Sequence, residues 1–406
     1  MIDTTCMYVS SSFRPDTAAV ATRSAGLVAA LQQRFARVIV LSSGPARQVE
    51  GVRVAGLGLA TPSNTLPVPL RLLQELCFAA WAGARLLLLI PPRSAMGRPV
   101  VLLSTPPLWL ALAGAATARL RGAAIAVDVR DRYPDVFFAM GLLRRNSRLG
   151  RLLLQAEAWL YRQAVLTTTV TEAIAAGIAA DHGGQPVALV RNGFDPQLFQ
   201  PDLALQPPGS SGQPLRLIMH GMFGRFFDRD AFEALLHGIQ RRQLPVELVV
   251  VGHGPQMPAL AAMASEQLVV EPPLPQAQVA RRIAACHLGL ALGIDNASMR
   301  GTFPTKLFEA IGCGLPVLVF PRSEAGLELA SRGMGWTFAG HQAEAAANVL
   351  EQLCRQPELW QQARQQVLDQ RLSYVRSHQA DRYAQLLAAA LTPAPPAPPA
   401  APSPAR

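Results

Sequence analysis

The sequence predicts an α/β protein built from two doubly wound, parallel-sheet domains that face each other across a cleft. Its 406 residues exceed the roughly 250–300 residues at which a single hydrophobic core stops growing. Short β-branched apolar runs alternate with helical patterns in both halves of the chain, as in parallel sheets with crossover helices. Residues 201–214, rich in proline, glycine and serine, separate the two halves and are expected to form a linker.

Residues 1–200 are expected to form the first domain. Helical patterns end near residue 31 and cover residues 108–120 and 149–163. Between them lie apolar runs typical of buried parallel strands. These runs are residues 6–9, 37–41, 100–103, 124–127, 165–167 and 187–190.

The same pattern restarts after the linker and predicts a second domain at residues 215–372. Its expected strands, each followed by a helical stretch, are residues 215–219, 246–251, 288–292 and 316–319. A C-terminal helix is expected at residues 373–391. Residues 392–406 consist mainly of alanine and proline, so they cannot bury a core and are expected to form a disordered, extended tail.

The positive charge is concentrated in the first half. Residues 1–200 hold 20 arginines and 11 acidic residues, whereas residues 201–406 hold 17 basic and 16 acidic residues. A basic face suits nucleic acid, an anionic bilayer or an anionic substrate. Readers of single-stranded nucleic acid usually interleave aromatic residues with the charge, and only 6% of this chain is aromatic, so no nucleic-acid partner is expected. A compositional preference for arginine explains the charge equally well.

Several features favour the cytoplasm. The five cysteines are scattered and form no C-x-x-C pair, which opposes disulfides and a zinc site. The first residues lack a basic segment followed by an apolar core, so no secretory signal is expected. The longest uncharged run, residues 99–118, contains Pro106 and Pro107. It therefore predicts a strand, a turn and a helix start, and no transmembrane helix is expected.

Loops that follow strands are the expected place for chemistry in such folds. In the loop at residues 220–225, Gly221 and Gly224 would let the backbone approach a phosphate, and Arg225 would add a bidentate cation. The glycines alternatively serve only to bend the chain. A second loop, Gly252-His253-Gly254-Pro255, is expected either to shape a nucleotide pocket or to act as a structural turn.

Asp228 and Asp230 form an Asp-x-Asp pattern that elsewhere binds metal ions. Asp228 stands where a helix N-cap belongs and Asp230 falls in the first turn, so capping is the favoured interpretation. No other carboxylates and histidines have ligand spacing. The sequence therefore predicts a site without a metal ion or a cofactor.

A third loop contains the only lysine of the chain, Lys306. Pro304 can start a helix, which places Thr305 and Lys306 at its positive end and Glu309 on the same face. An ammonium group suits a diphosphate, and a carboxylate accepts hydrogen bonds from ribose hydroxyls. The alternative is a surface Lys–Glu pair worth only about 0.2–0.5 kcal/mol. A lysine in a chain that otherwise uses arginine favours a specific role.

Four stretches in this order resemble glycosyltransferase family 4, retaining enzymes of the GT-B fold, and especially its O-antigen, capsule and exopolysaccharide branch. They are VDVRDRYPD at 127–135, VRNGFD at 190–195 with Phe199, GHGP at 252–255, and PTKLFE at 304–309 with GCGLPV at 312–317. The resemblance implies two Rossmann-like domains, the first binding the acceptor and the second the nucleotide sugar. It also implies a C-terminal helix that packs back on the first domain.

The resemblance assigns roles to individual residues. Arg225 and Lys306 match residues that bind the donor diphosphate, and Glu309 matches the one that binds the ribose. Asn192 matches a loop lining the cleft, and Asp131 a polar position facing the transferred sugar or the acceptor. The further residues expected at the donor are Gly221, Gly224, Gly252, Gly254, Thr305 and Leu307.

Two positions depart from the family pattern. Gly301 stands eight residues before Glu309, where family members often carry an acidic residue. Contacts to the sugar are then expected from elsewhere, or from backbone amides near Met299 and Arg300. The sequence SSSFRP at residues 10–15 replaces a glycine pair in the first loop.

The function implied is transfer of a hexosyl group, with retention, from a nucleotide-diphosphate sugar, expected to be a UDP-sugar, to a lipid-linked saccharide in cell-surface polysaccharide biosynthesis. A retaining hydrolase needs two carboxylates about 5–5.5 Å apart. The sequence indicates no such pair, so front-face transfer is the favoured mechanism. The alternatives are a GT-B sugar-nucleotide epimerase and a non-catalytic nucleotide-sugar binding protein.

The first half also contains a candidate membrane-binding region. Residues 69–90 form an apolar helical pattern with Arg71 and Arg85, and residues 137–140 precede four arginines at positions 144, 145, 148 and 151. This combination can lie on an anionic bilayer, as in a peripheral protein on the inner face of the plasma membrane. The alternative is a buried helix beside a solvated basic loop.

Overall fold

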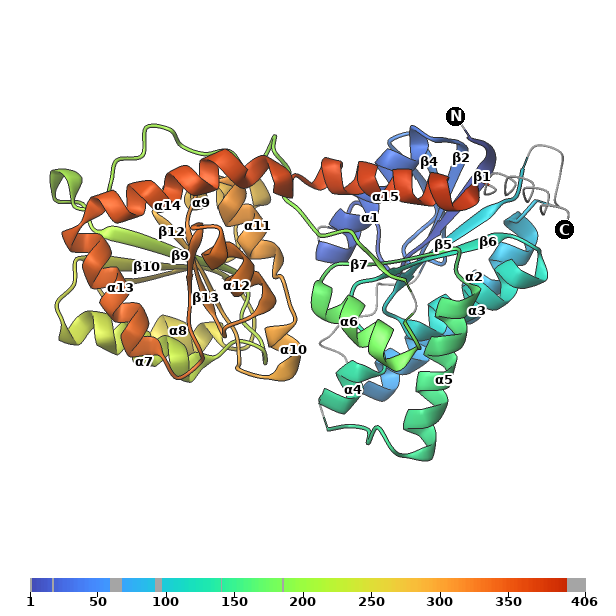
Figure 1. The fold of residues 1–406 in the computed structure, drawn as a ribbon, viewed down its shortest axis with the longest axis horizontal. Coiled ribbons are helices and arrows are strands. Elements are labelled where there is room, and N and C mark those ends of the chain that lie inside the picture. The colour runs from blue at the N-terminus through green and yellow to red at the C-terminus, as the bar shows by residue number, and fades with distance from the viewer. Residues whose placement is uncertain are drawn as a thin grey trace, which may run out of the picture.

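The structure is a computed structural model that describes residues 2–16, 18–58, 68–91, 97–139, 141–184 and 186–392. The expected tail lies outside the described residues from residue 393 onward. Figure 1 shows two α/β lobes side by side, each built around its own sheet. The predicted fold class is confirmed.

The first domain contains an eight-stranded sheet with the order β3-β4-β2-β1-β5-β6-β7-β8. Its strands are β1 (Ile2–Val9), β2 (Phe35–Ser42), β3 (Arg47–Val49), β4 (Val52–Gly56), β5 (Val100–Thr105), β6 (Ala124–Val129), β7 (Leu166–Thr169) and β8 (Ala188–Leu189). Neighbouring strands are parallel except for the β3–β4 hairpin at one edge. Strands β5 and β6 are buried along their whole length, which explains their continuous apolar sequence.

Helices cover both faces of this sheet. One face carries α2 (Val68–Leu89), α3 (Leu108–Leu120) and α5 (Arg148–Gln163), and the other carries α1 (Ala19–Gln32) and α15 (Arg376–Leu391). Strand β1 contributes to both cores, because Met7 points to one face and Tyr8 to the other. Two short helices, α4 (Asp135–Ala139) and α6 (Glu172–Asp181), follow the carboxyl ends of β6 and β7.

The second domain contains a six-stranded parallel sheet with the order β11-β10-β9-β12-β13-β14. Its strands are β9 (Leu215–Met222), β10 (Val246–His253), β11 (Leu268–Glu271), β12 (Leu288–Leu292), β13 (Val317–Phe320) and β14 (Gly335–Thr337). The order of the strands reverses between β9 and β12. Doubly wound sheets bind ligands outside the carboxyl ends of their strands at such a reversal, so the fold points to the ends of β9 and β12.

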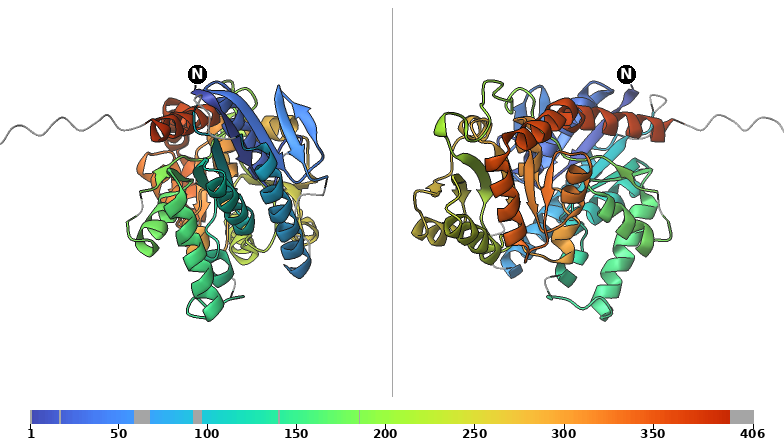
Figure 2. Two further views of the ribbon diagram at one scale, coloured as in Figure 1. Left: turned by 90° about the vertical axis from the view of Figure 1, so that its right-hand side faces the viewer. Right: turned by 60° about the vertical axis from the view of Figure 1, so that its left-hand side comes forward.

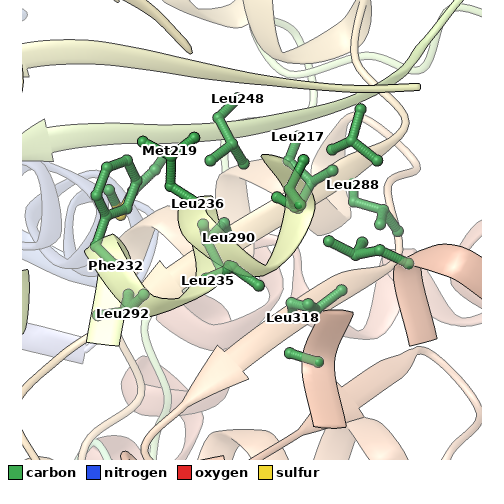
Figure 3. Packing of buried hydrophobic residues seen from close by; sticks show 14 of the residues in the cluster. Leu217, Met219, Phe232, Leu235, Leu236, Leu248, Leu288, Leu290, Leu292 and Leu318 are labelled. Carbon is green, nitrogen blue, oxygen red and sulfur yellow. The ribbon is translucent and has the colours of Figure 1, made fainter. Parts of the chain in front are cut away.

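Two cores enclose the second sheet. On one face, α7 (Arg229–Arg241) and α13 (Ala343–Arg355) pack on leucines of β9, β10, β12 and β13, as Figure 3 shows around Leu217, Leu235 and Leu290. On the other face lie α9 (Gln276–Ala284) and α11 (Thr305–Gly312). The remaining helices are α8 (Met257–Ala262), α10 (Ala297–Arg300), α12 (Glu324–Ser331) and α14 (Pro357–Gln370).

The C-terminal helix joins the two domains. The backbone amide of Phe194 donates to Tyr374 O (3.1 Å), and that of Arg376 donates to Phe194 O (2.9 Å). The segment around Phe194, where the chain leaves the first domain, therefore lies beside the segment at Tyr374–Arg376, where the chain returns to it. From there α15 runs along the first domain and packs on α1 (Figures 1 and 2). The expected return of this helix to the first domain is confirmed.

Helix α2 is the one helix among the described residues that is long and apolar enough to cross a membrane by length and composition. It packs on α3 with a face that contains Phe78, Ala82 and Leu86, and only 33% of its most apolar window is buried. The uncharged run at residues 99–118 forms β5 and α3, as expected.

Candidate functional site

Two cavities lie between the domains, and the larger has a volume of about 520 Å³. The ends of β9, β12 and β13 and the start of α11 line its second-domain side. Residues of α2 together with Tyr133, Val136, Phe137 and Leu142 line its first-domain side. It therefore occupies the position that the strand order indicates. Apolar side chains form most of its wall, and its charged residues are Arg71, Glu75, Arg225 and Lys306.

The two glycine loops pack directly on each other. The amide of Phe223 donates to His253 O (2.8 Å), and that of Gln256 donates to Phe223 O (3.1 Å). A Cβ on Gly252 would lie 1.9 Å from Gly221 O, and one on Gly254, whose φ is +127°, would lie 2.6 Å from Phe223 O. Gly252 and Gly254 thus permit close backbone contact and line neither cavity.

The loop after β9 reaches the larger cavity through Gly224 and Arg225. Gly221 precedes it with a φ of +107° and has open space where a Cβ would point. Arg225 is exposed and lies over the ring of Phe226, with its guanidinium carbon 4.8 Å from the ring centroid. Arg225 therefore lines the cavity between the domains, and its predicted contact with a diphosphate stays a prediction.

Lys306 lies at the start of α11 and faces the same cavity. Its Nζ is 5.6 Å from the centroid of the Phe223 ring, and no carboxylate of the described residues lies within 4 Å of it. Burial lowers its pKa to about 8, although the charge of Glu309 acts in the opposite direction. No side chain caps α11, so a half-buried cation and a helix N-terminus together favour an anion here.

Glu309 and Thr305 face the smaller cavity, which has a volume of about 100 Å³. Oε2 of Glu309 lies 2.5 Å from Nε2 of His220, a buried residue of β9. This contact fixes the orientation of the carboxylate. Lys306 and Glu309 therefore line different cavities, although their three-residue spacing had suggested that they share one face of the helix.

Asn192 also lines the smaller cavity, and its Oδ1 accepts a hydrogen bond from Nη1 of Arg23 (3.2 Å). Arg23 is buried and binds both carboxylate oxygens of Asp128, at 2.9 and 2.7 Å. Burial tends to raise the pKa of Asp128, but Arg23 outweighs it and holds that pKa below its usual value. Arg23 therefore anchors the loop of Asn192. Sequence reasoning missed it because an arginine in a first helix gives no sign of burial.

Like Gly221, Gly252 and Gly254, the predicted residues Asp131 and Leu307 line neither cavity. Asp131 is exposed after the end of β6. The side chain of Leu307 is buried in the core beneath α11, beside Phe308 and Ile311. Any contact of Leu307 with a ligand would have to come from its backbone.

Three residues on the first-domain wall were not among the predicted site residues. Nε of Arg71 donates to Oε1 of Glu75 (3.0 Å), and Nη2 of Arg71 donates to the hydroxyl of Tyr133 (3.2 Å). All three line the larger cavity. The signal in the sequence was an Arg–Glu pair, four residues apart, within an otherwise apolar helix.

The capping interpretation of Asp228 is confirmed, because its side chain accepts a hydrogen bond from the amide of Ala231 (3.0 Å) at the start of α7. Asp230 lies in the first turn of that helix. Within the described part of the chain, no three His, Cys, Asp or Glu residues come together as a metal site.

Gly301 lies close to the first domain. A Cβ at this position would be 2.9 Å from the Cβ of Ala173 in α6. Helix α6 is tied to the second domain by Glu324, which accepts from the amides of Glu172 (2.9 Å) and Ala173 (2.8 Å) and pairs with Arg191 (3.0 Å). The departure from the family pattern at residue 301 therefore permits close approach of α6.

Two family models match the sequence. The model described as "Glycosyl transferase 4-like domain" matches residues 18–193, and the model described as "Glycosyl transferases group 1" matches residues 218–356. One match falls in each domain. Among curated proteins, no sequence matches this chain.

Solved glycosyltransferase structures share the fold. A sucrose-phosphate synthase from Thermosynechococcus elongatus has a TM-score of 0.67 at 15% identity, covering 95% of this chain and 100% of its own. HepE from Anabaena in complex with UDP has a TM-score of 0.63 at 14% identity, covering 95% and 100%. WaaG, a glycosyltransferase involved in lipopolysaccharide biosynthesis, has a TM-score of 0.64 at 16% identity, covering 94% and 99%.

Proposed function

The chain is a glycosyltransferase of the GT-B type, and from this premise we propose that it transfers a hexosyl group from a UDP-sugar, with retention, to a lipid-linked saccharide in cell-surface polysaccharide biosynthesis. The observation that carries the proposal is the placement of Lys306. A half-buried ammonium group without a carboxylate partner within 4 Å among the described residues lies at a helix start, in a cavity between two doubly wound domains. That environment favours a diphosphate.

The donor is proposed to bind at the start of α11, with its diphosphate in the larger cavity and its ribose in the smaller one. Lys306 and Arg225 hold the diphosphate in the larger cavity, and Glu309, oriented by His220, accepts hydrogen bonds from the ribose hydroxyls in the smaller one. Support for UDP comes from HepE, whose structures were determined in complex with UDP and with UDP-glucose.

Front-face transfer fits the charges of the cavity. A double displacement uses a second carboxylate as nucleophile, and Glu75 is the one carboxylate among the described residues that line the larger cavity. In front-face transfer the acceptor oxygen bonds to the anomeric carbon while the bond from that carbon to the donor phosphate breaks. The electron pair leaves with UDP, and a phosphate oxygen takes the acceptor proton. Lys306 and Arg225 stabilise the departing charge.

The lipid-linked acceptor and the membrane are proposed from the first domain. Five leucines of α2 are exposed, namely Leu70, Leu73, Leu76, Leu87 and Leu88, while Arg71 and Glu75 of the same helix line the cavity. An apolar helix face on a basic domain suits the inner surface of an anionic membrane. WaaG, which shares the fold, is involved in lipopolysaccharide biosynthesis. The protein is accordingly proposed to be cytoplasmic and peripheral.

A panel of UDP-, GDP- and dTDP-sugars tests this function, each incubated with and without prenyl-diphosphate-linked monosaccharides. We expect UDP to be released from a UDP-sugar only when the lipid-linked acceptor is present. Conversion of a donor without any acceptor would indicate an epimerase. Nucleotide binding with no turnover on any acceptor would indicate a binding protein, and either result would refute the transfer reaction.

A further inference from the structure

Glu75 is the one acidic residue among the described residues that line the larger cavity. It lies on α2, in the first-domain wall, while Lys306 and Arg225 belong to the second-domain side. Only 3% of its surface is exposed. Burying a carboxylate is unfavourable, so its presence in a largely apolar wall requires an explanation.

The hydrogen bonds of Glu75 leave part of the carboxylate available. Oε1 accepts from Nε of Arg71 at 3.0 Å, and no donor among the described residues bonds to Oε2. Burial raises the pKa of Glu75 above its usual value, although Arg71 acts in the opposite direction. A carboxylate oxygen of a largely buried residue that lines a cavity and accepts no hydrogen bond from a described residue favours a ligand that donates one.

An ion pair that only stabilises a helix is more exposed in this protein than the Arg71–Glu75 pair. Arg229 and Glu233 of α7 have the same four-residue spacing and lie 3.2 Å apart, but 36% of the Glu233 side chain is exposed and neither residue lines either cavity. Exposed pairs of this kind stabilise helices only slightly. In the Arg71–Glu75 pair, by contrast, only 4% of the Glu75 side chain is exposed. The two pairs have the same spacing along a helix, and they differ in that Arg71 and Glu75 line the larger cavity.

We propose that Glu75, held in place by Arg71, binds a hydroxyl group of the acceptor sugar and so forms the polar part of the acceptor subsite. The inference rests on the proposed transfer reaction and extends it. Leu72, Val136 and Phe137 supply an apolar surface beside the carboxylate, which suits the less polar face of a pyranose ring. Asp131, exposed and outside the cavity, is not needed for this contact.

Binding measurements on the full-length protein test this assignment. UDP affinity is measured by calorimetry, and the affinity for octyl hexosides and octyl N-acetylhexosaminides is measured by saturation-transfer NMR in the presence of UDP. Glu75→Gln keeps the size of the side chain and removes its charge. We expect it to leave UDP affinity within about twofold and to weaken binding of the preferred glycoside by about 10- to 100-fold, the range for a lost hydrogen bond to a charged group.

Two further variants complete the experiment. Arg71→Gln removes the ion pair that holds Glu75 and leaves Glu75 itself unchanged, so it is also expected to weaken glycoside binding. UDP binding shows that each variant is folded. Glu233→Gln, in the exposed pair, should change neither affinity. Glycoside affinity within twofold of the wild type in folded Glu75→Gln protein would overturn the assignment, as would a wild type that binds UDP but no glycoside. A wild type that binds no nucleotide would instead refute the proposed function on which the assignment rests.

Discussion

Lys306 combines partial burial, a helix start and the absence of a nearby carboxylate partner among the described residues. A protein gains little stability from such an ammonium group, because its desolvation is not offset by an ion pair. The favourable partner is therefore expected to be a ligand anion. His220 acts in a different way, since it contacts Glu309 and orients the carboxylate.

Replacing Lys306 tests its contact with the diphosphate. Lys306→Ala should lower kcat at least about 100-fold, as expected for a group that stabilises charge in the transition state, while the circular dichroism spectrum stays unchanged. Near-normal turnover in a folded Lys306→Ala protein would contradict the assignment.

The same residue should make UDP binding depend on pH. Because the pKa of Lys306 is lowered to about 8, the free protein loses this positive charge as the pH rises through 8, and the affinity for UDP should fall about tenfold between pH 7 and pH 9. Calorimetry on the wild type and on Lys306→Arg provides the comparison. The arginine stays charged throughout, so its affinity should remain nearly constant.

At the scale of elements, the sequence predicted the central strands better than the edges. Strands β5, β6, β10 and β12 are largely buried on both faces and have mostly apolar sequences. Strands β3, β4, β11 and β14, which lie at or beside sheet edges, were not predicted. They are three to five residues long, and none of them is buried along its whole length, so their sequences lack a sustained apolar run.

The candidate site was predictable to the extent that it lies on loops after strands. Arg225 and Lys306 were expected in one cleft on that basis and do share a cavity. Glu75 was missed because it lies on a helix, far from any strand end in the sequence. The separation of Glu309 from Lys306 was missed because spacing along a helix does not specify which cavity each side chain enters.

Helix α2 gives the element-scale prediction, which concerns membrane binding. Leu73 and Leu88 are 57% and 76% exposed, so changing both to glutamate should leave the fold intact while removing apolar contact and adding repulsion from anionic lipid. We expect recovery in flotation with phosphatidylcholine–phosphatidylglycerol vesicles to fall about tenfold, given about 1.5–3 kcal/mol for each buried leucine.

A matched control lies elsewhere on the surface. Leu203 is 78% exposed and lies outside α2, so Leu203→Glu should not change flotation. Equal recovery of the wild type with neutral and with anionic vesicles would remove the membrane proposal. Equal loss in the α2 variant and in Leu203→Glu would show that α2 has no specific part in it.

At the scale of the whole molecule, hydrogen bonds and ion pairs between described residues link the two domains in two regions. One region is the backbone pairing between Phe194 and residues Tyr374 and Arg376, next to the start of α15. The other is formed by Glu324 of α12, which accepts hydrogen bonds from the first amides of α6 and pairs with Arg191, while Arg191 also binds Glu328 at 2.7 Å. A carboxylate at a helix N-terminus is stabilised by the helix dipole, so this contact favours the arrangement in which the donor and acceptor walls face each other.

Removing the charge of Glu324 should therefore open the cleft. Glu324→Gln weakens hydrogen bonds to a charged group that contribute about 1.5–3 kcal/mol, so the population of closed protein should fall. We expect a larger radius of gyration by small-angle scattering and a UDP Kd about five- to tenfold higher, because the closed state, in which both domains line the nucleotide cavities, is then less populated. Glu344→Gln is the control, since Glu344 pairs with Arg241 and Arg242 inside the second domain. An unchanged radius of gyration together with an unchanged UDP Kd in Glu324→Gln would mean that the contact with α6 does not hold the domains closed.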